Sequence, residues 1–391
     1  MDGFRRIPCV IQRGGTSKGV FLHARDLPVD PGARERVVLA IFGSPDTRQI
    51  DGLGGADPLT SKVAIIGPPT RPDADVDYTF GAVGIAEAKV DFRGNCGNIS
   101  SAVGPFAIDE GLVAATDPVT RVRIHNTNTG RILIARVRTR GGRARYTGEV
   151  AIDGVPGTSA PIELDYSATA GSATGRLLPT GHTIDRIRVD GVGEIEVSIV
   201  DAGNPVVFMR PEPLGLTGAE GPSDPLILAA LDAIERIRGA AAAMIGMVAD
   251  AARARSEIPS IPMLALIREP AGYASFADGH RIDDADVDFV ARLFYMQVMH
   301  KTYAGTGTVA TGVAARIPGT IVERAARPAS RTAKTVRIGH PAGVITIDVD
   351  VASRGGNHEL RNAAFVRTSR RILEGAVWVA DTAFSGAATA A

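Results

Sequence analysis

Two regions of this chain share one local plan, and that internal repeat limits the folds that the chain can adopt. Residues 7–23 read as a strand, a Gly-rich loop and a second strand, and residues 199–209 repeat this order. Residues 300–315 in turn repeat a loop that opens a small-residue helix at residues 94–108. The repeat therefore predicts two similar halves, with the functional site in the cleft between them.

The length of the chain agrees with two domains. A single hydrophobic core tends to stop growing near ~250–300 residues, whereas this chain has 391. We expect an α+β protein with an N-terminal domain over residues 1–185, to which a C-terminal strand within 372–391 returns. The second domain covers 186–371 and contains an Ala-rich helical pair at 223–255, broken near Gly239, which favours a homodimer.

Composition argues against several classes of function. Lysine plus arginine and aspartate plus glutamate each total 43, and no basic block stands out, so a nucleic-acid partner gains no support. No stretch reaches the ~18 apolar residues of a membrane span, and the first residues lack the apolar core of a signal peptide. A cytoplasmic protein without a membrane partner is therefore expected.

Motif spacing narrows the chemistry further. The two cysteines, Cys9 and Cys96, are far apart, which predicts neither a disulfide framework nor a metal site. His-Glu-x-x-His and Cys-x-x-Cys spacings do not occur, and no nucleophile elbow of a triad hydrolase is expected. The remaining expectation is acid–base chemistry on a small molecule without a cofactor.

Cys96 is the first candidate for that chemistry. It lies between Asn95 and Gly97 at the predicted start of a helix, where backbone N–H groups and the helix dipole favour a thiolate. A buried structural cysteine is the alternative. Cys9, inside an apolar strand, is expected to be a cysteine of that second kind.

Lys62 is the second candidate. It follows Thr60 and Ser61 at a loop-to-strand junction and precedes an apolar run. A lysine at the mouth of a buried strand is partly removed from water, which makes the neutral amine available as a base. A surface lysine whose stem covers apolar residues is an equally open interpretation from the residues alone.

Gly-rich loops in both halves are candidate carboxylate sites. Thr16, Ser17 and Lys18 lie in the first loop, which lacks the Gly-Lys-Ser/Thr order of a nucleotide-binding loop. Its backbone N–H groups and hydroxyl nevertheless suit an anion. Thr306 and Gly307 supply a matching helix start in the second half. A plain turn is the alternative at each loop.

Two further segments have a functional and a structural interpretation. His300 directly precedes the second helix start, where it is placed to bind a carboxylate or act as an acid, or else to be a core histidine. Residues 126–130, Asn-Thr-Asn-Thr-Gly, either offer amide donors to a ligand or form a turn.

Four motifs together resemble one known family. They occupy residues 13–21, 51–55, 60–62 and 94–106, and the resemblance extends from the first strand to at least Val322. The chain is similar to the PrpF-like family of 2-methylaconitate isomerase, 3-methylitaconate isomerase and 4-oxalomesaconate tautomerase. The resemblance implies a fold like that of diaminopimelate epimerase, with two pseudo-symmetric domains, each a curved mixed sheet around a central helix.

The resemblance also implies roles for individual residues. The family pairs a lysine at the position of Lys62 with a cysteine at the position of Cys96, and it places residues matching Ser17 and His300 around the substrate. The other substrate contacts expected on this basis come from the same loops and helix starts, namely Thr16, Lys18, Ser61, Gly97, Asn98, Thr306 and Gly307.

The implied activity is a cofactor-independent isomerisation of a small unsaturated di- or tricarboxylate. A base, either Lys62 or Cys96, removes a proton beside a double bond conjugated with a carboxylate, and the proton returns at the other allylic carbon. Epimerases of this fold use one cysteine from each domain, whereas the second half here has Ala304-Gly-Thr-Gly-Thr at that place. A racemase is therefore disfavoured, and a non-catalytic carboxylate-binding protein is the other alternative.

Overall fold

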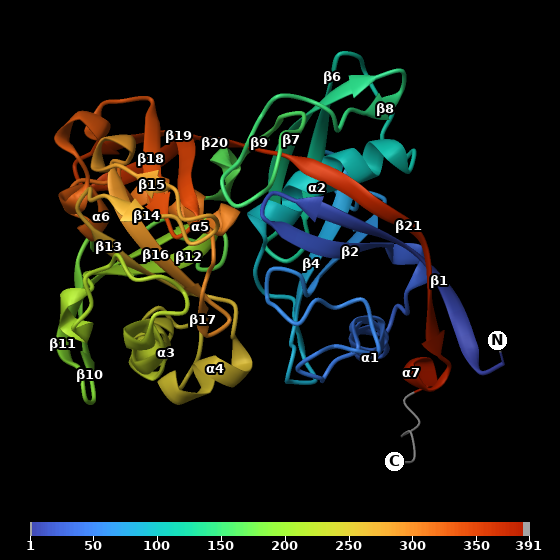
Figure 1. Cartoon of the computed structure of the whole chain (residues 1–391), viewed down its shortest axis with the longest axis horizontal. Helices are drawn as coiled ribbons and strands as arrows, with labels where there is room; N and C mark the ends of the chain where they lie inside the picture. Colours follow the sequence, from blue (N-terminus) through green and yellow to red (C-terminus); the bar gives the residue numbers. More distant parts are fainter. Residues whose placement is uncertain (1, 386–391) are drawn as a thin grey trace. The chain divides into compact units, whose positions relative to one another are not determined.

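Each half of this α+β chain wraps a mixed sheet around one central helix, as the computed structural model shows for residues 2–385 (Figure 1). The described residues divide into two units. Unit 1 takes the residues up to Val150, Thr158–Ile162 and those from Arg367 onward, and unit 2 takes Ala151–Gly157 and Glu163–Val366. The expected domain boundary after residue 185 stays a prediction. The expected last strand included residues 386–391, which lie outside the described residues.

Unit 1 contains the elements β1 (Phe4–Gly14), β2 (Ser17–His23), α1 (Pro31–Phe42), β3 (Lys62–Gly67), β4 (Val76–Val83), β5 (Val90–Asp91), α2 (Gly97–Asp109), β6 (Val119–Asn126), β7 (Arg131–Arg140), β8 (Arg143–Ala144), β21 (Ser369–Ala380) and α7 (Thr382–Ser385), and a 3-10 turn at Ala24–Asp26. Strand β1 pairs antiparallel with both β2 and β21. The sheet continues through β2–β3 (parallel), β3–β4 (antiparallel), β4–β6 (parallel) and β6–β7 (antiparallel).

Helix α2 is the central helix of unit 1. It packs against β1, β2, β3 and β7, and every residue from Gly97 to Ile108 is buried. The small side chains predicted for this helix explain its place, because they let strands approach it from several directions. The N-terminus of α2 is thereby fixed inside the unit rather than at its surface.

Unit 2 contains β9 (Ile162–Asp165), β10 (Asp185–Val189), β11 (Gly193–Ala202), β12 (Asn204–Met209), α3 (Pro225–Met244), α4 (Ala254–Glu257), β13 (Met263–Arg268), β14 (Tyr273–Ala274), β15 (Arg281–Ile282), β16 (Phe289–Tyr295), β17 (Val298–Met299), α5 (Gly305–Ala314), α6 (Ile321–Ala325), β18 (Thr335–His340), β19 (Gly343–Arg354) and β20 (Asn357–Arg367), apart from single residues at the ends of β9 and β20. Its 3-10 turns lie at Ser167–Thr169, Glu212–Leu214, Ala251–Arg253, Asp284–Asp286 and Pro328–Arg331.

The internal repeat predicted from the sequence is confirmed by strand pairing. In unit 2, neighbouring strands alternate between antiparallel and parallel pairing in the same order as in unit 1. The pairs are β11–β12, β12–β13, β13–β16, β16–β18 and β18–β19. Helix α5 packs against β11, β12, β18 and β19, and all its residues are buried, like Gly97–Ile108 of α2. Each unit therefore builds the same sheet-and-helix layout from its own segment.

The helical segment at 223–255 differs from its prediction in one respect. Helix α3 does not break near Gly239 but continues through it to Met244. The glycine serves close packing instead, since a Cβ at Gly239 would lie 2.4 Å from the carbonyl oxygen of Ala251. Among residues 2–385, no helix combines the length and the apolar character needed to cross a membrane.

Candidate active site

Three polar side chains from distant parts of the sequence meet inside unit 1. Lys62 Nζ lies 2.9 Å from Ser17 Oγ and 3.3 Å from Cys96 Sγ. All three residues are buried: Lys62 and Ser17 are each 2% exposed, and Cys96 is 7% exposed. An amine and a thiol at hydrogen-bond distance can exchange one proton, because the amine–thiol pair and the ammonium–thiolate pair differ only in where that proton lies.

The fold brings these side chains together by aligning the starts of three elements. Ser17 begins β2 and Lys62 begins β3, and these two strands are parallel neighbours. Cys96 is the N-cap residue of α2, which packs against both strands. The thiol consequently lies at the positive end of a helix dipole, which favours negative charge on a nearby group.

The backbone around Cys96 is held by its neighbours rather than by its own thiol. Asn95 Oδ1 accepts the N–H of Cys96 at 2.7 Å, and Ser100 Oγ lies 2.9 Å from the Cys96 carbonyl oxygen. The Cys96 side chain forms no capping hydrogen bond with the helix. The sulfur can therefore face Lys62 while Asn95 and Ser100 fix the helix start.

The loop between β1 and β2 lies against the first turn of α2. Gly15 has a φ of 51°, and a Cβ there would lie 2.2 Å from Asn98 Oδ1, so both its conformation and its surroundings require glycine. Asn98 Nδ2 donates to Thr16 Oγ1 at 3.1 Å, and the Thr16 N–H donates to Asn98 Oδ1 at 3.4 Å. Thr16 and Asn98, both expected near the substrate, are thus in direct contact.

Arg13 is a residue near this loop to which the sequence reasoning gave no role. Its guanidinium donates to the carbonyl oxygens of Gly15 at 2.9 Å and Thr368 at 3.1 Å. Burial, and secondarily the charge of Arg370, lowers the pKa of the Arg13 guanidinium. An arginine stays charged at any ordinary pH, so Arg13 brings a fixed positive charge to the loop and holds it in place.

The Gly15–Gly19 segment has the Gly-x-Ser-x-Gly spacing of a hydrolase nucleophile elbow but not its structure. An elbow joins a strand to a helix, whereas this segment joins two antiparallel strands, with Gly14 opposite Ser17. Ser17 contacts an amine rather than a histidine base. The spacing is therefore present in the sequence, without the strand-to-helix turn that an elbow requires.

Two residues expected near the substrate point elsewhere. Lys18 follows Ser17 on β2, and successive strand residues project to opposite faces, so Lys18 does not share the face that Ser17 turns to Lys62. Ser61 donates its hydroxyl to Gln49 Oε1 at 2.7 Å, and the same oxygen accepts the Ala56 N–H at 2.8 Å. Ser61 thus ties down the loop before β3, and Gln49 is a partner that the sequence did not suggest.

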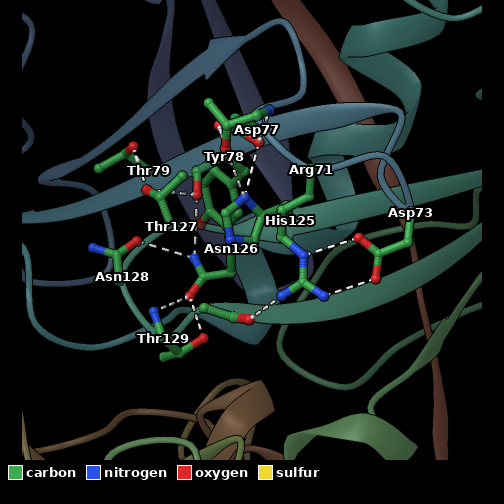
Figure 2. A network of polar contacts seen from close by, with 12 residues as sticks. Arg71, Asp73, Asp77, Tyr78, Thr79, His125, Asn126, Thr127, Asn128 and Thr129 are labelled. Carbon is green, nitrogen blue, oxygen red and sulfur yellow. Dashed lines mark hydrogen bonds and ion pairs between the residues drawn. The ribbon is translucent and has the colours of Figure 1, made fainter.

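The Asn126–Gly130 segment forms a turn whose amides are used inside unit 1 (Figure 2). Asn126 Nδ2 donates to Asn128 Oδ1 at 3.0 Å, and Asn126 Oδ1 accepts the Thr129 hydroxyl at 2.7 Å. Of the two interpretations of this segment, the structure supports the turn.

Asn128 in this turn connects strand β4 to the segment just before Cys96. Its Oδ1 accepts the Phe80 N–H at 2.8 Å and its Nδ2 donates to the Phe80 carbonyl at 2.8 Å, as a neighbouring strand would. Its Nδ2 also contacts the Phe92 carbonyl oxygen. Phe80 lies on β4, the partner of β3, and Phe92 lies four residues before Cys96. Asn128 is therefore placed to fix the position of Cys96 relative to Lys62.

The remaining candidates belong to unit 2. His300 is 3% exposed, and its Nδ1 accepts the Thr302 N–H at 3.1 Å. Thr306 and Gly307 lie in the first turn of α5, and Asn204 Nδ2 donates to Thr306 Oγ1 at 3.0 Å. That these residues share one substrate site with Lys62 stays a prediction.

The donor groups around Cys96 suit proton transfer. They are the amine of Lys62 and, bonded to it, the hydroxyl of Ser17. Within residues 2–385, no three His, Cys, Asp or Glu side chains are arranged so that they could hold a metal ion together.

Comparison with known sequences finds similarity along nearly the whole chain. Residues 4–380 match the model of the family described as PrpF protein. The chain is 54% identical to 3-methylitaconate isomerase of Eubacterium barkeri, covering 97% of this chain and 98% of that protein. It is 41% identical to (4E)-oxalomesaconate Delta-isomerase of Novosphingobium sp. strain KA1 (95% and 97% covered) and 38% identical to 2-methyl-aconitate isomerase of Cupriavidus necator (97% and 98% covered).

Solved structures agree with the fold described above. A methylitaconate-delta-isomerase structure matches with a TM-score of 0.79 at 52% identity, covering 100% of both chains. A hydroxyproline epimerase from Agrobacterium vitis matches with a TM-score of 0.59 at 14% identity, covering 96% of this chain and 93% of that one. The second similarity concerns the fold alone. The expected epimerase-like α+β fold is confirmed.

Proposed function

This chain belongs to the PrpF protein family, and from that membership we propose that Lys62 and Cys96 move a proton between two carbons of a small unsaturated polycarboxylate. The chain is an isomerase of unsaturated carboxylates, in line with relatives that carry such names at 38–54% identity. The family resemblance found in the motifs is confirmed. The roles of individual residues, the substrate and the assembly are proposals.

The contact between Lys62 Nζ and Cys96 Sγ at 3.3 Å is the observation that carries this mechanism. One of the two groups removes a proton from the carbon next to a carboxylate, and the resulting negative charge spreads over the double bond and that carboxylate. A proton then returns to the far carbon of the former double bond. Because the two groups lie side by side, we propose that removal and return occur on the same face of the substrate.

Backbone groups would stabilise the intermediate. Developing negative charge on the carboxylate suits donors that are fixed in advance and shielded from water. The first turn of α2, with Gly97 and Asn98, and the loop at Thr16 and Ser17 are the proposed donors. The Lys62–Ser17 contact at 2.9 Å supports this arrangement by orienting the amine. No cofactor takes part in these steps, and the proposed enzyme requires none.

A methylitaconate-like dicarboxylate is the proposed substrate. The relative named 3-methylitaconate isomerase is 54% identical, against 41% and 38% for those named after oxalomesaconate and methylaconitate. In methylitaconate the proton to be removed lies on a carbon that bears a carboxylate and a methyl group. Its transfer turns the terminal methylene into a second methyl group and moves the double bond between the two carboxylate-bearing carbons.

A homodimer in the cytoplasm is the proposed assembly and location. Leu226, Leu228 and Met244 of α3 are 56%, 56% and 43% exposed, and we propose that a second copy of the chain covers part of this helix. Cys9 and Cys96 are both free thiols, as a reducing compartment favours. Light scattering coupled to size exclusion checks the dimer, and a monomeric mass would contradict it.

The decisive experiment follows methylitaconate, methylaconitate, oxalomesaconate and aconitate in D2O by proton NMR. We expect isomerisation of methylitaconate with deuterium entering the new methyl group, and slower or no turnover of the other acids. Dialysis against a chelator should leave the rate unchanged. If none of the four acids exchanges or isomerises at high enzyme concentration, the proposed reaction is wrong.

A further inference from the structure

Four arginine side chains gather on one face of the β6–β7–β8 sheet of unit 1. Arg138 and Arg140 are two residues apart on β7 and so share one face of the strand. Arg143 on β8 and Arg145 just after it are spaced in the same way. Arg140 is paired with Arg143, and the bond from the Arg145 N–H to the Arg138 carbonyl at 2.8 Å continues this register. Directly opposite residues of an antiparallel pair project from the same face. Two arginine–arginine pairs are therefore stacked along one hairpin.

Within the described residues, these four arginines lack the ion pairs that other arginines of the chain form. Like charges directly opposite each other destabilise a sheet, and all four arginines are exposed. None of them forms an ion pair with another described residue, although arginines such as Arg71 do, with Asp73 at 2.7 Å. The chain has as many acidic as basic side chains, 43 of each, so the face is not the result of a general shortage of carboxylates.

The face also contains a cavity of about 530 Å³. Its charged lining consists of Arg138, Arg140, Arg145, Asp117 and Glu149. One oxygen of Asp117 already accepts the Gly141 N–H at 2.7 Å. A volume of this size suits a small molecule. The lining includes none of Ser17, Lys62 and Cys96, so this cavity is distinct from the candidate active site.

We propose that the cavity lined by Arg138, Arg140 and Arg145 binds a compact anion that carries two or three carboxylate or phosphate groups. Guanidinium groups match both kinds of anion with two parallel hydrogen bonds. Two or more anionic groups on one small molecule can neutralise the three lining arginines at once. A macromolecular partner is the weaker choice, because the arginines surround a cavity of ligand size.

The test is calorimetric titration of the full chain at low ionic strength, with citrate in one arm and pyrophosphate in the other. The key variant is Arg140→Gln/Arg145→Gln. The matched control is Arg188→Gln, which removes an exposed arginine of β10 in unit 2. Lys62→Ala serves as a second control, because a polycarboxylate can also enter the proposed active site.

We expect one binding event that persists in Arg188→Gln and Lys62→Ala and weakens about tenfold or more in the double variant. The stronger of the two arms identifies whether carboxylate or phosphate is preferred. In buffer without multivalent anions the double variant should melt no lower than the wild type, because like-charge repulsion has been removed.

Four outcomes overturn the proposal. Equal affinity in the double variant and the wild type excludes these arginines, and an equal loss in Arg188→Gln reduces the effect to overall charge. A change in oligomeric size caused by the double variant alone would instead make the face a contact between copies of this chain. Loss of the binding event in Lys62→Ala assigns it to the active site.

Discussion

The two units use the same strand pairing and the same buried central helix, yet only unit 1 places reactive groups at the corresponding points. Lys62 begins β3, whereas Met263 begins β13. These strands correspond, because β3 pairs parallel with β2 and β13 pairs parallel with β12. Cys96 caps α2, whereas Ala304 caps α5. The fold therefore supplies positions at a helix start, and side-chain identity decides whether such a position does chemistry.

The comparison also distinguishes this chain from a two-thiol epimerase. Such an enzyme needs an acid–base group in each half, one for each face of a stereocentre. Here an amine and a thiol from the same unit lie within 3.3 Å of each other. Because both groups lie in one half, they suit the transfer of a proton between two carbons on one face of the substrate. That transfer is the proton shift proposed above.

The largest effect should come from removing either group of the Lys62–Cys96 pair. Lys62→Ala and Cys96→Ala should each lower kcat/KM about 10²–10⁴-fold, because each deletes a proton-transfer group. Met263→Leu, the substitution at the matching strand start of unit 2, preserves side-chain volume and should leave kcat/KM nearly unchanged. Steady-state kinetics with melting temperatures checks all three. Wild-type turnover in both alanine variants would refute the assigned roles.

The next largest effect should come from Asn128, which joins β4, the partner of the strand that begins with Lys62, to the segment before Cys96. Asn128→Ala leaves backbone groups of Phe80 and Phe92 without this partner, so unfolding free energy should fall by about 1–3 kcal/mol. If Asn128 positions Cys96, kcat should also fall, and the rate at which iodoacetamide modifies Cys96 should change, measured in a Cys9→Ser background. Asn128→Asp keeps the acceptor but turns a carboxylate oxygen toward the Phe80 and Phe92 carbonyl oxygens, so it should be destabilised at least as much as Asn128→Ala. A purely structural role would lower stability and leave thiol reactivity as it was.

A smaller effect is expected at Ser17, whose hydroxyl contacts Lys62. Ser17→Ala removes one hydrogen bond worth about 1 kcal/mol, so kcat should fall about fivefold. The matching first residue of β12 is Asn204, which donates to Thr306 instead. Asn204→Ala should act mainly on KM, since Thr306 is a proposed substrate contact. If both variants changed kcat and KM in the same proportion, the separate roles assigned to Ser17 and Asn204 would be wrong.

The smallest effect should be on the pH dependence of stability, through Glu110 at the C-terminal end of α2. Burial alone would raise the pKa of Glu110, but hydrogen bonds and charges of Arg371 and His23 outweigh it and hold the pKa below its ordinary value of 4.5. A lowered folded-state pKa contributes stability above the unfolded value, and that contribution is lost as pH falls through the folded value. Unfolding free energy should therefore decline below about pH 4.5, and less steeply in Glu110→Gln. Identical slopes in the wild type and the variant would exclude Glu110. The matching C-cap residue of α5 is Ala315, which has no carboxylate.

The sequence by itself predicted the broad fold and the pair of reactive groups. Its repeated strand, Gly loop and small-residue helix correspond to real elements because local patterning decides them: Gly15 needs its positive φ, and small side chains let α2 be buried. The family motifs then pointed to Lys62 and Cys96. These features depend on neighbouring residues or on a continuous run of residues, so a single amino-acid sequence is enough to predict them.

Other features were decided only by tertiary structure. Lys62 and Cys96 are 34 residues apart in sequence, and their 3.3 Å contact depends on β3 and α2 packing together. The face on which Lys18 projects depends on the strand phase, and Ser61 turned out to bond Gln49. Helix α3 ran through Gly239 because a neighbouring backbone packs there. The sequence determines which groups are present, and packing between distant segments decides which of them meet, because contacts across the sheet leave no local pattern.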